Sequence, residues 1–184
     1  MKIGYCICGS FCTHKQSLSV LRKLCADHEV VPILSETVTK TDTRFGKAED
    51  LIKTAADLCK RDPVMSIKDA EPLGPKEPLD LLVICPCTGN TLAKLAAGIT
   101  DTTVTMAVKA TVRADRPVLI ALCSNDALGA NLRNIGELLN RKNYYFAPLH
   151  YDDPVNKPHS LVSDFGMICE CAELAVRRKQ IPIF

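Results

Sequence analysis

The chain has 184 residues, of which 47% are hydrophobic and 24% are charged. This length and mixture are typical of one folded domain with its own core, and they exclude a disordered chain. Because 23 Lys and Arg residues oppose 21 Asp and Glu residues, the formal net charge is only +2. A charge this small argues against nucleic acid or an anionic membrane as the partner. We expect a single domain over residues 1–184.

Ten cysteines stand out in a chain that has no tryptophan. The N-terminal segment MKIGYCICGS lacks the pattern of a secretory signal. No apolar run approaches the ~20 residues that a membrane helix needs. We therefore expect a cytoplasmic protein whose thiols stay reduced, so that its cysteines are packing residues, metal ligands or redox groups.

Strands and helices alternate along the chain according to the spacing of apolar residues. The predicted order is strand 2–8, helix 14–27, strand 29–34, polar loop 35–45, helix 47–60, irregular connection 61–79, strand 80–85, helices 90–98 and 102–113, strand 117–123, helix 127–141, strand 143–147, loop 148–158 and helix 160–178. The strands DLLVIC and PVLIALC are continuously apolar, which is typical of strands covered on both faces. The sequence therefore predicts an α/β fold in which helices cover both faces of a parallel sheet.

Ligands of such sheets bind outside the carboxyl ends of the strands, so the loops after residues 8, 34, 85 and 123 form the candidate site. The first loop, Gly9 to Cys12, lies between a strand and a helix start, where free N–H groups favour phosphate. It matches neither GxGxxG nor a P-loop, which argues against an ordinary dinucleotide or ATP site. A plain strand-to-helix turn is the alternative for this loop.

The third loop, Pro86 to Thr91, carries two hydroxyls, a glycine and an amide at the start of the next helix. These neutral donors suit a phosphate or a planar polar ring better than a divalent metal, which prefers carboxylates. Helix capping is the alternative for this loop. Ser35, after the second strand, and the segment Cys123 to Ala127, after the fourth, are equally consistent with caps or loops.

Three segments together resemble a known family: GSFC after the first strand, PCTGNTLAKLAAGITDTTVT in the middle, and the capped loop after PVLIALC. On these segments the chain is similar, over nearly its whole length, to the flavin-dependent cysteine decarboxylases and their flavin prenyltransferase relatives. The resemblance implies a flavodoxin-like (Rossmann-type) three-layer α/β/α sandwich that binds FMN. It also implies a homo-oligomer, either a trimer or an assembly of trimers.

The same resemblance implies roles for residues that match the family motifs. Gly9 and Ser10 would hold the FMN phosphate, and Ser35 would contact the phosphate or the ribityl chain. The phosphate, ribityl chain and flavin edge would be surrounded by Thr88, Gly89, Asn90 and Thr91. Asn125 would stand where the decarboxylases carry an Asn that helps to bind substrate or flavin.

The chain departs from the decarboxylases at two places. Their active-site His lies in the connection before a central strand, whereas residues 63–80 here contain no His. Their Pro-x-Met-Asn motif is replaced by the segment Leu122 to Asn125, in which only the Asn remains. These departures argue against cysteine decarboxylation, and an FMN-dependent lyase stays as an alternative.

Within that group, KPHSLVSDF and SNDALGANLRNIGELLNRKNYYF resemble a narrower family, the B subunits of dipicolinate synthases. This resemblance implies an oxidoreductase subunit that takes part in NAD(P)-linked oxidation of a dihydrodipicolinate-type intermediate to dipicolinate. The location would be the mother-cell cytoplasm of a spore former. The separate A subunit of the synthase would carry the NAD(P) site, which agrees with the missing GxGxxG. A non-catalytic flavin-binding or assembly subunit is a further alternative.

A dicarboxylate substrate needs positive groups that face it. Lys157 and His159, before the last predicted helix, are the catalytic candidates together with Asn125. Arg113 and Arg116 are weaker candidates for contact with substrate, and so is Arg133. A solvated loop is the alternative for the segment that carries Lys157 and His159.

The cysteines divide by position along the chain. Six lie within predicted strands or helices and are expected to pack as small apolar residues: Cys6, Cys25, Cys59, Cys85, Cys169 and Cys171. Four fall at the carboxyl edge of the sheet, around the candidate site: Cys8, Cys12, Cys87 and Cys123. These four are either small residues that let a ligand approach or thiols activated near a helix N-terminus. The Cys-x-Cys pairs at 6/8 and 85/87 would share a strand face, but no pattern of zinc ligands accompanies them, and we expect no metal.

Overall fold

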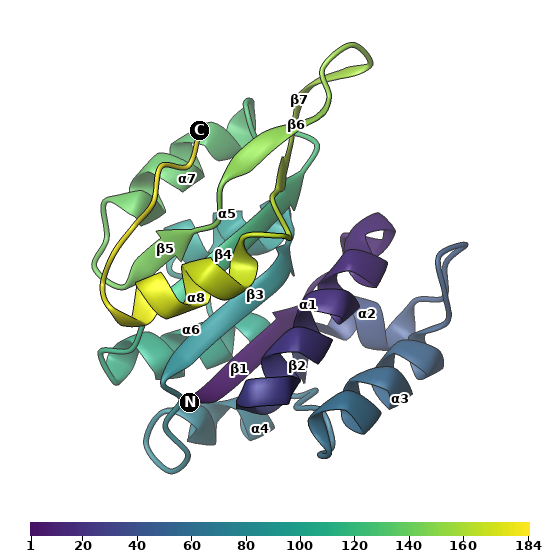
Figure 1. The fold of residues 1–184 in the computed structure, drawn as a ribbon, viewed down its shortest axis with the longest axis vertical. Coiled ribbons are helices and arrows are strands. Elements are labelled where there is room, and N and C mark those ends of the chain that lie inside the picture. Colours follow the sequence, from purple (N-terminus) through teal and green to yellow (C-terminus); the bar gives the residue numbers. More distant parts are fainter.

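Seven strands form one sheet in the computed structural model, which describes residues 1–184 (Figure 1). The strands are β1 (Lys2–Ile7), β2 (Glu29–Leu34), β3 (Leu81–Cys87), β4 (Val118–Ser124), β5 (Tyr144–Phe146), β6 (Leu149–Asp153) and β7 (Lys157–Ser163). Their order is β2-β1-β3-β4-β7-β6, and β5 pairs with β4 beside that path. The pairs among β1 to β5 are parallel, whereas β7 is antiparallel to β4 and β6. The predicted flavodoxin-like fold is confirmed, with an antiparallel hairpin added to it.

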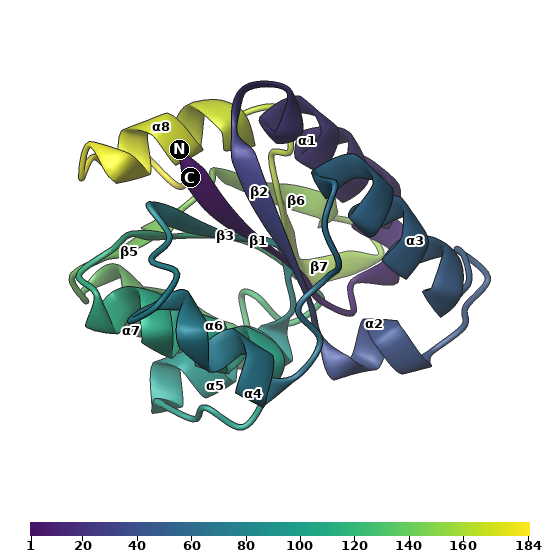
Figure 2. The same cartoon turned by 90° about the horizontal axis from the view of Figure 1, so that it is seen from below.

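Helices cover both faces of the sheet (Figure 2). One face carries α1 (His14–Asp27), α3 (Ala48–Cys59) and α8 (Ile168–Val176). The other carries α5 (Gly89–Ala97), α6 (Thr103–Arg113) and α7 (Ala130–Leu139). Four short helices complete the chain: η1 (Phe11–Thr13), α2 (Glu36–Lys40), α4 (Ile67–Ala70) and η2 (Glu71–Leu73).

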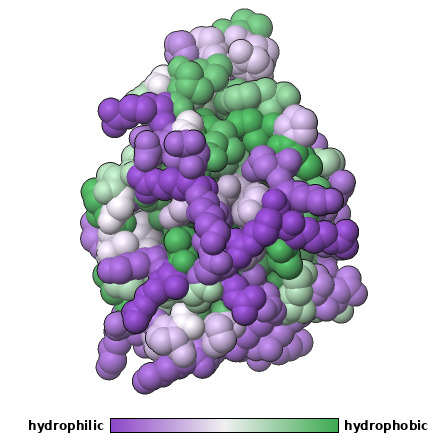
Figure 3. Space-filling model, turned by 90° about the vertical axis from the view of Figure 1, so that its left-hand side faces the viewer, coloured by the Kyte–Doolittle hydropathy of each residue, from purple (hydrophilic) through white to green (hydrophobic).

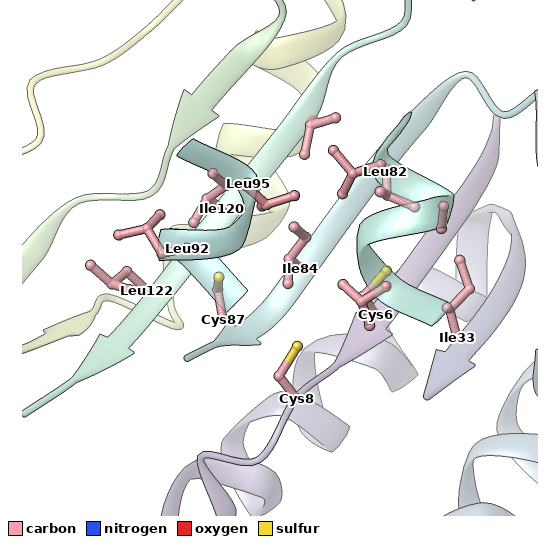
Figure 4. Packing of buried hydrophobic residues seen from close by; sticks show 14 of the residues in the cluster. Cys6, Cys8, Ile33, Leu82, Ile84, Cys87, Leu92, Leu95, Ile120 and Leu122 are labelled. Atoms are coloured by element: carbon pink, nitrogen blue, oxygen red, sulfur yellow. The ribbon is translucent and has the colours of Figure 1, made fainter. Parts of the chain in front are cut away.

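The alternation of side chains along the buried strands divides the core into two clusters, one on each face of the sheet. Ile84 of β3 belongs to a cluster of 25 buried residues that α5, α6 and α7 cover. Its neighbour Val83 belongs to a cluster of 21 buried residues beneath α1, α3 and α8. Figure 4 shows how Leu92 and Leu95 of α5 lie over the strands of the first cluster. This double burial explains why β3 and β4 are apolar along their whole length.

Cys85 and Cys87 do not share a strand face, so the expectation for this pair was wrong. Cys85 packs in the cluster beneath α1, α3 and α8, and Cys87 packs in the opposite cluster. The cause is an irregularity in β3, whose register against β4 shifts between Ile84 and Cys87. Cys6 and Cys8 do lie in the same cluster, as an undisturbed strand requires.

The hairpin of β6 and β7 replaces the predicted loop 148–158 and the start of the helix predicted at 160, and α8 begins only at Ile168. The last two residues of β4 pair with β7, which fixes the hairpin beside the end of the sheet. Beyond this pairing the hairpin projects away from the sheet (Figure 1). Its outer half is exposed and polar, so apolar spacing carried no strand signal there.

Three further boundaries differ from the sequence-based expectation. The helices α2 and α4 lie in segments that were predicted to be loop or irregular. The helix predicted from residue 127 begins at Ala130, because the carbonyl oxygen of Asp126 accepts hydrogen bonds from the N–H groups of Gly129 (2.9 Å) and Asn131 (3.2 Å). These bonds close a turn at the end of β4, and that turn positions part of the candidate site.

The outer surface mixes polar and apolar groups. Figure 3 shows one side of the molecule, on which hydrophobic areas lie between hydrophilic side chains. Ile99, just after α5, exposes 44% of its surface, and Leu132, within α7, exposes 46%. No helix combines the length and the apolar composition that crossing a bilayer would require.

A buried chain of hydrogen bonds ties α1 to the centre of the sheet. The Ser17 hydroxyl donates to the carbonyl oxygen of Cys85 (2.5 Å), and the Tyr5 hydroxyl donates to the carbonyl oxygen of Ser17 (2.8 Å). All three residues are buried, and burial raises the pKa of the Tyr5 phenol well above its ordinary value. The phenol therefore stays protonated and remains a donor.

Replacing Ser17 should destabilise the fold, because it removes a hydrogen bond between two buried groups. We expect Ser17→Ala to lower the free energy of unfolding by about 1–3 kcal/mol in urea denaturation. Ser19→Ala, on the exposed side of the same helix, is the matched control and should change it by less than about 0.5 kcal/mol. Equal losses in the two variants would contradict this role for Ser17.

Candidate functional site

The carboxyl ends of β1, β3 and β4 open into a cleft of about 770 Å³, which we call the main cleft. It is lined by Gly9–Thr13, Thr88–Asn90, Cys123–Asp126, the turn residues Arg44 and Phe45, and the inner side of the hairpin. A volume of this size is ordinary for a small-molecule site. The main cleft lies where parallel α/β sheets bind their ligands.

A second hollow of about 220 Å³, the side pocket, shares Gly9, Thr88 and Asn90 with the main cleft. Ser35 and Thr91 line the side pocket. The structure thus brings all of the residues with an expected FMN role to two adjoining hollows. They are Gly9, Ser10, Thr88, Gly89, Asn90 and Asn125 in the main cleft, and Ser35 and Thr91 in the side pocket.

The loop after β1 is shaped by hydrogen bonds to its own backbone. The carbonyl oxygen of Cys8 accepts from the N–H of Ser10 (2.9 Å) and lies 2.9 Å from Nε2 of His14. Burial lowers the pKa of His14, which favours the neutral ring. A Cβ atom on Gly9 would come within 3.3 Å of the Thr37 side chain. The loop therefore presents its backbone directly to the side pocket.

The loop after β3 begins α5 with a side-chain cap. The Thr88 hydroxyl accepts from the N–H of Thr91 (3.3 Å) and lies 3.1 Å from the Thr91 hydroxyl, which itself donates to the Cys8 sulfur (3.6 Å). Capping, one of the two interpretations of this loop, is therefore correct for Thr88. The exposed side chain of Asn90 has no hydrogen-bond partner and lies free at the junction of the two hollows.

A polar cluster at the end of β4 faces Gly89. Oδ1 of Asp126 accepts from the Ser124 hydroxyl (2.5 Å) and from Nδ2 of Asn131 (2.7 Å), and Oδ1 of Asn131 accepts from Asn134 (2.9 Å). The bond from Ser124, followed by that from Asn131, lowers the pKa of Asp126. Asn131 and Asn134 are buried, although sequence reasoning placed them on an ordinary helix. Their spacing of three residues on one helix face was the available signal.

Ser35 brings a buried, unpartnered hydroxyl to the side pocket. It stands at the N-cap position of α2 but makes no capping bond, which argues against the cap interpretation. Its hydroxyl is buried and has no hydrogen-bond partner, and leaving such a group unsatisfied is costly. The charged neighbours in the side pocket are already engaged, since Glu36 accepts from Thr103 (2.7 Å) and Lys94 pairs with Asp101 (2.8 Å). The donor set fits a phosphate or a sugar-like hydroxyl chain.

The cationic candidates are scattered. Lys157 lines the main cleft, but its ammonium pairs with Asp152 at 2.7 Å. That carboxylate raises the pKa of Lys157. His159 is exposed on β7 and lines neither hollow.

The three weaker arginine candidates lie away from the cleft. Arg113 and Arg133 line other hollows, and Arg116 lies 3.9 Å from Asp80. Sequence reasoning missed two basic residues that do line the main cleft, Arg44 and His150. Their segments carry no motif, and only the packing of the turn and the hairpin brings them there.

Three of the four edge cysteines line the hollows. Cys8 lines the side pocket, and Cys12 and Cys123 line the main cleft, whereas Cys87 lies in the core and lines neither. Burial raises the pKa of Cys8 and of Cys123 to about 11, and that of Cys87 well above its ordinary value. The buried thiols are therefore protonated at neutral pH, which favours the packing interpretation over an activated thiolate.

The remaining cysteines pack as expected, in or against the two core clusters. All ten cysteines are free thiols. Nowhere in the structure do three or more His, Cys, Asp or Glu side chains gather as a metal site would require.

Comparison with known proteins identifies the family. The Flavoprotein family matches residues 1–167. The chain belongs to the Flavoprotein family. It is 41% identical over 181 residues to the dipicolinate synthase B subunit of Bacillus subtilis (strain 168), with 98% of this chain and 90% of that protein covered. The expected kinship with flavoproteins and with dipicolinate synthase B subunits is confirmed.

Two solved structures have a similar fold. The crystal structure of the dipicolinate synthase B subunit from Bacillus halodurans C has a TM-score of 0.90 and 40% identity, covering 99% of this chain and 94% of that one. The FMN-dependent cysteine decarboxylase SpaF has a TM-score of 0.67 and 23% identity, covering 96% and 97%. The second likeness concerns the fold alone.

Gly89 should tolerate no side chain, because the polar cluster of β4 occupies that space. A Cβ there would overlap the Ser124 hydroxyl and lie 2.5 Å from Nδ2 of Asn131. We expect Gly89→Ala to destabilise the protein by about 1–3 kcal/mol in thermal or urea denaturation. Gly136→Ala, at an open position within α7, should instead stabilise it by about 0.5–1 kcal/mol. A stabilised Gly89→Ala variant would show that the cluster does not pack against this glycine.

Proposed function

We propose that this chain is the B subunit of a dipicolinate synthase and that its main cleft and side pocket bind FMN. The sequence identity of 41% to a dipicolinate synthase B subunit supports the first part. The observation that carries the second is the buried, unpartnered Ser35 hydroxyl in a mainly neutral pocket whose two charged residues, Glu36 and Lys94, are already engaged. The reaction would be the NAD(P)-linked oxidation of a dihydrodipicolinate-type intermediate to dipicolinate.

Different residues around the two hollows would bind different parts of FMN. Gly9 and Ser10, just before a helix, would bind the phosphate through the Gly9 N–H and the Ser10 hydroxyl, since the Ser10 N–H already donates to Cys8. Ser35 would donate to the phosphate or to the ribityl chain. The ribityl chain and the flavin edge would be surrounded by Thr88, Gly89, Asn90 and Thr91. Bound FMN would supply a two-electron acceptor beside the substrate.

The chain's own contribution to the reaction is binding and orientation. Asn125 presents its amide to the main cleft, and its Oδ1 accepts a long hydrogen bond from the Ser160 hydroxyl (3.5 Å). That contact would orient the Asn125 side chain toward substrate or flavin. Lys157 would form part of the cleft wall, where its ammonium stays paired with the Asp152 carboxylate. His159 lines neither hollow, so we propose no catalytic role for it.

An FMN-dependent lyase is the second candidate function. The fold of the cysteine decarboxylase SpaF favours it. The connection between α3 and β3 carries no His, which argues against it. Release of CO₂ from a thiol-containing carboxylate by the FMN-loaded protein would establish the lyase and refute the synthase assignment.

The proposed function implies partners and a location. The A subunit of the synthase would bring NAD(P), and a homo-oligomer, a trimer or an assembly of trimers, would bury apolar surface such as that of Ile99 and Leu132. A net charge of +2 gives no reason to propose nucleic acid as a partner. The proposed location is the mother-cell cytoplasm of a spore former.

Flavin binding can be separated from folding at Ser35. Its hydroxyl is buried and has no partner within the chain, so Ser35→Ala should leave the unfolding free energy unchanged or raise it by up to about 1–3 kcal/mol, because it removes an unpaired buried group. The same variant should weaken FMN binding about tenfold, since it removes a hydrogen bond to the ligand. Quenching of flavin fluorescence measures the affinity, with Ser19→Ala as the control. Unchanged affinity in Ser35→Ala would remove Ser35 from the site.

Synthase activity should require both subunits. We expect dipicolinate formation by the A subunit with NAD(P) to rise at least tenfold when this chain and FMN are added. Absorbance of dipicolinate in the ultraviolet follows the product. Full activity in the absence of this chain would refute the proposal. Unchanged turnover of a complex carrying Asn125→Ala would favour the assembly role over a part in catalysis.

A further inference from the structure

A tight turn between α2 and α3 reaches the main cleft from a part of the chain that no motif marks. Arg44 and Phe45 form its tip, and both line the main cleft, together with the loops after β1, β3 and β4. Phe45 also lines the neighbouring hollow beside α1 and α3. It exposes 53% of its surface, which is a large share for an aromatic side chain.

The turn is held in place by its own hydrogen bonds. The N–H of Thr43 donates to the carbonyl oxygen of Gly46 (3.0 Å), and the N–H of Gly46 donates back to Thr43 (3.2 Å). The Thr43 hydroxyl accepts from the N–H of Phe45 (3.1 Å). Gly46 has a φ of +152°, a conformation that favours glycine. A carboxylate oxygen of Asp42 accepts from the N–H of Ala48 (2.9 Å), which joins the turn to the start of α3.

The Arg44 guanidinium has no hydrogen-bond or ion-pair partner, whereas the other Lys and Asp side chains of the main cleft are engaged. Lys157 is paired with Asp152 at 2.7 Å, and Asp126 is held by Ser124 and Asn131. The Arg44 guanidinium instead lies over the Phe45 ring, 4.8 Å from its centroid. Its N–H donors have no partner in the chain and remain free for a ligand, while the guanidinium keeps its contact with the ring.

We propose that the Arg44–Phe45 turn binds the substrate: Arg44 forms a two-pronged hydrogen bond with one carboxylate of a planar dicarboxylate, and Phe45 packs against the substrate ring. This inference rests on the proposed function, and it names the residues that select the substrate. An anionic substrate would meet the carboxylates of Asp126 and Asp152 in the same cleft, so it needs a cation that is not already neutralised. Arg44 is the Lys or Arg residue of the main cleft that meets this requirement.

The test compares charged and neutral ligands of the same shape. Pyridine-2,6-dicarboxylate and its neutral diamide, pyridine-2,6-dicarboxamide, are titrated calorimetrically into the FMN-loaded full chain, first by itself and then in complex with the A subunit. We expect Arg44→Ala to raise the dissociation constant of the dicarboxylate at least tenfold and to leave that of the diamide within about twofold. Arg44→Lys, which keeps the charge but loses the planar fork, should fall between. Phe45→Leu should weaken both ligands about threefold to tenfold.

Two controls separate this inference from the proposed function. Arg22→Ala removes the same charge from an exposed position on α1, away from the cleft, and should bind both ligands as the wild type does. The affinity for FMN, measured in every variant, should stay unchanged.

If the wild type binds the dicarboxylate and Arg44→Ala binds it equally well, the role of Arg44 is refuted while the proposed function stands. An equal loss in Arg22→Ala would likewise refute it, since the effect would then be one of overall charge. If the wild type binds no dicarboxylate, in complex or by itself, the proposed substrate and the role of Arg44 fall together.

Discussion

The contact between Gly89 and the polar cluster of Ser124, Asp126 and Asn131 holds the site together. It brings the start of α5 against the end of β4, so that the loops after two neighbouring strands meet without a gap. The cluster satisfies its own hydrogen bonds, because Asp126 accepts from both neighbours. Ser124 and Asn131 are buried, and their hydrogen bonds to the exposed Asp126 carboxylate fix both side chains in place. The main cleft therefore has one stiff wall, to which the hairpin and the Arg44–Phe45 turn are added.

The parts of the fold that could be predicted are those whose own residues determine their structure. The strands β3 and β4 are apolar almost throughout because both faces are buried, and the parallel strands β1 to β4 place their loops at one edge of the sheet. The hairpin could not be predicted, because its outer half is exposed and polar and only β7 joins it to the end of β4. For the same reason Lys157 was expected in a loop, and its pairing with Asp152 across the hairpin was missed.

Some residues of the candidate site could be predicted from the sequence, and others could not. Gly9 and Thr88 follow strands that were easy to recognise, so their meeting at the side pocket follows from topology. Arg44 is separated from that topology by a turn with no recognised motif, and it reaches the cleft only through tertiary packing. A short run of sequence can reveal which groups a helix start offers. It cannot reveal which turn, distant in the sequence, will pack beside those groups in the fold.

The fold does not determine the reaction, which depends on the residues of the loops around the cleft. A structure described as an FMN-dependent cysteine decarboxylase shares the fold at 23% identity. One scaffold can thus present a flavin-type pocket to different substrates. Arg44 and the hairpin line the main cleft from segments outside the parallel strands.

Ser35 gives the folded chain a thermodynamic link to whatever fills the side pocket. Its hydroxyl is desolvated on folding and remains without a partner. A ligand that accepts from it is bound by the native state and not by the unfolded chain, so it shifts the folding equilibrium by mass action. The melting temperature of the protein then becomes a function of ligand concentration.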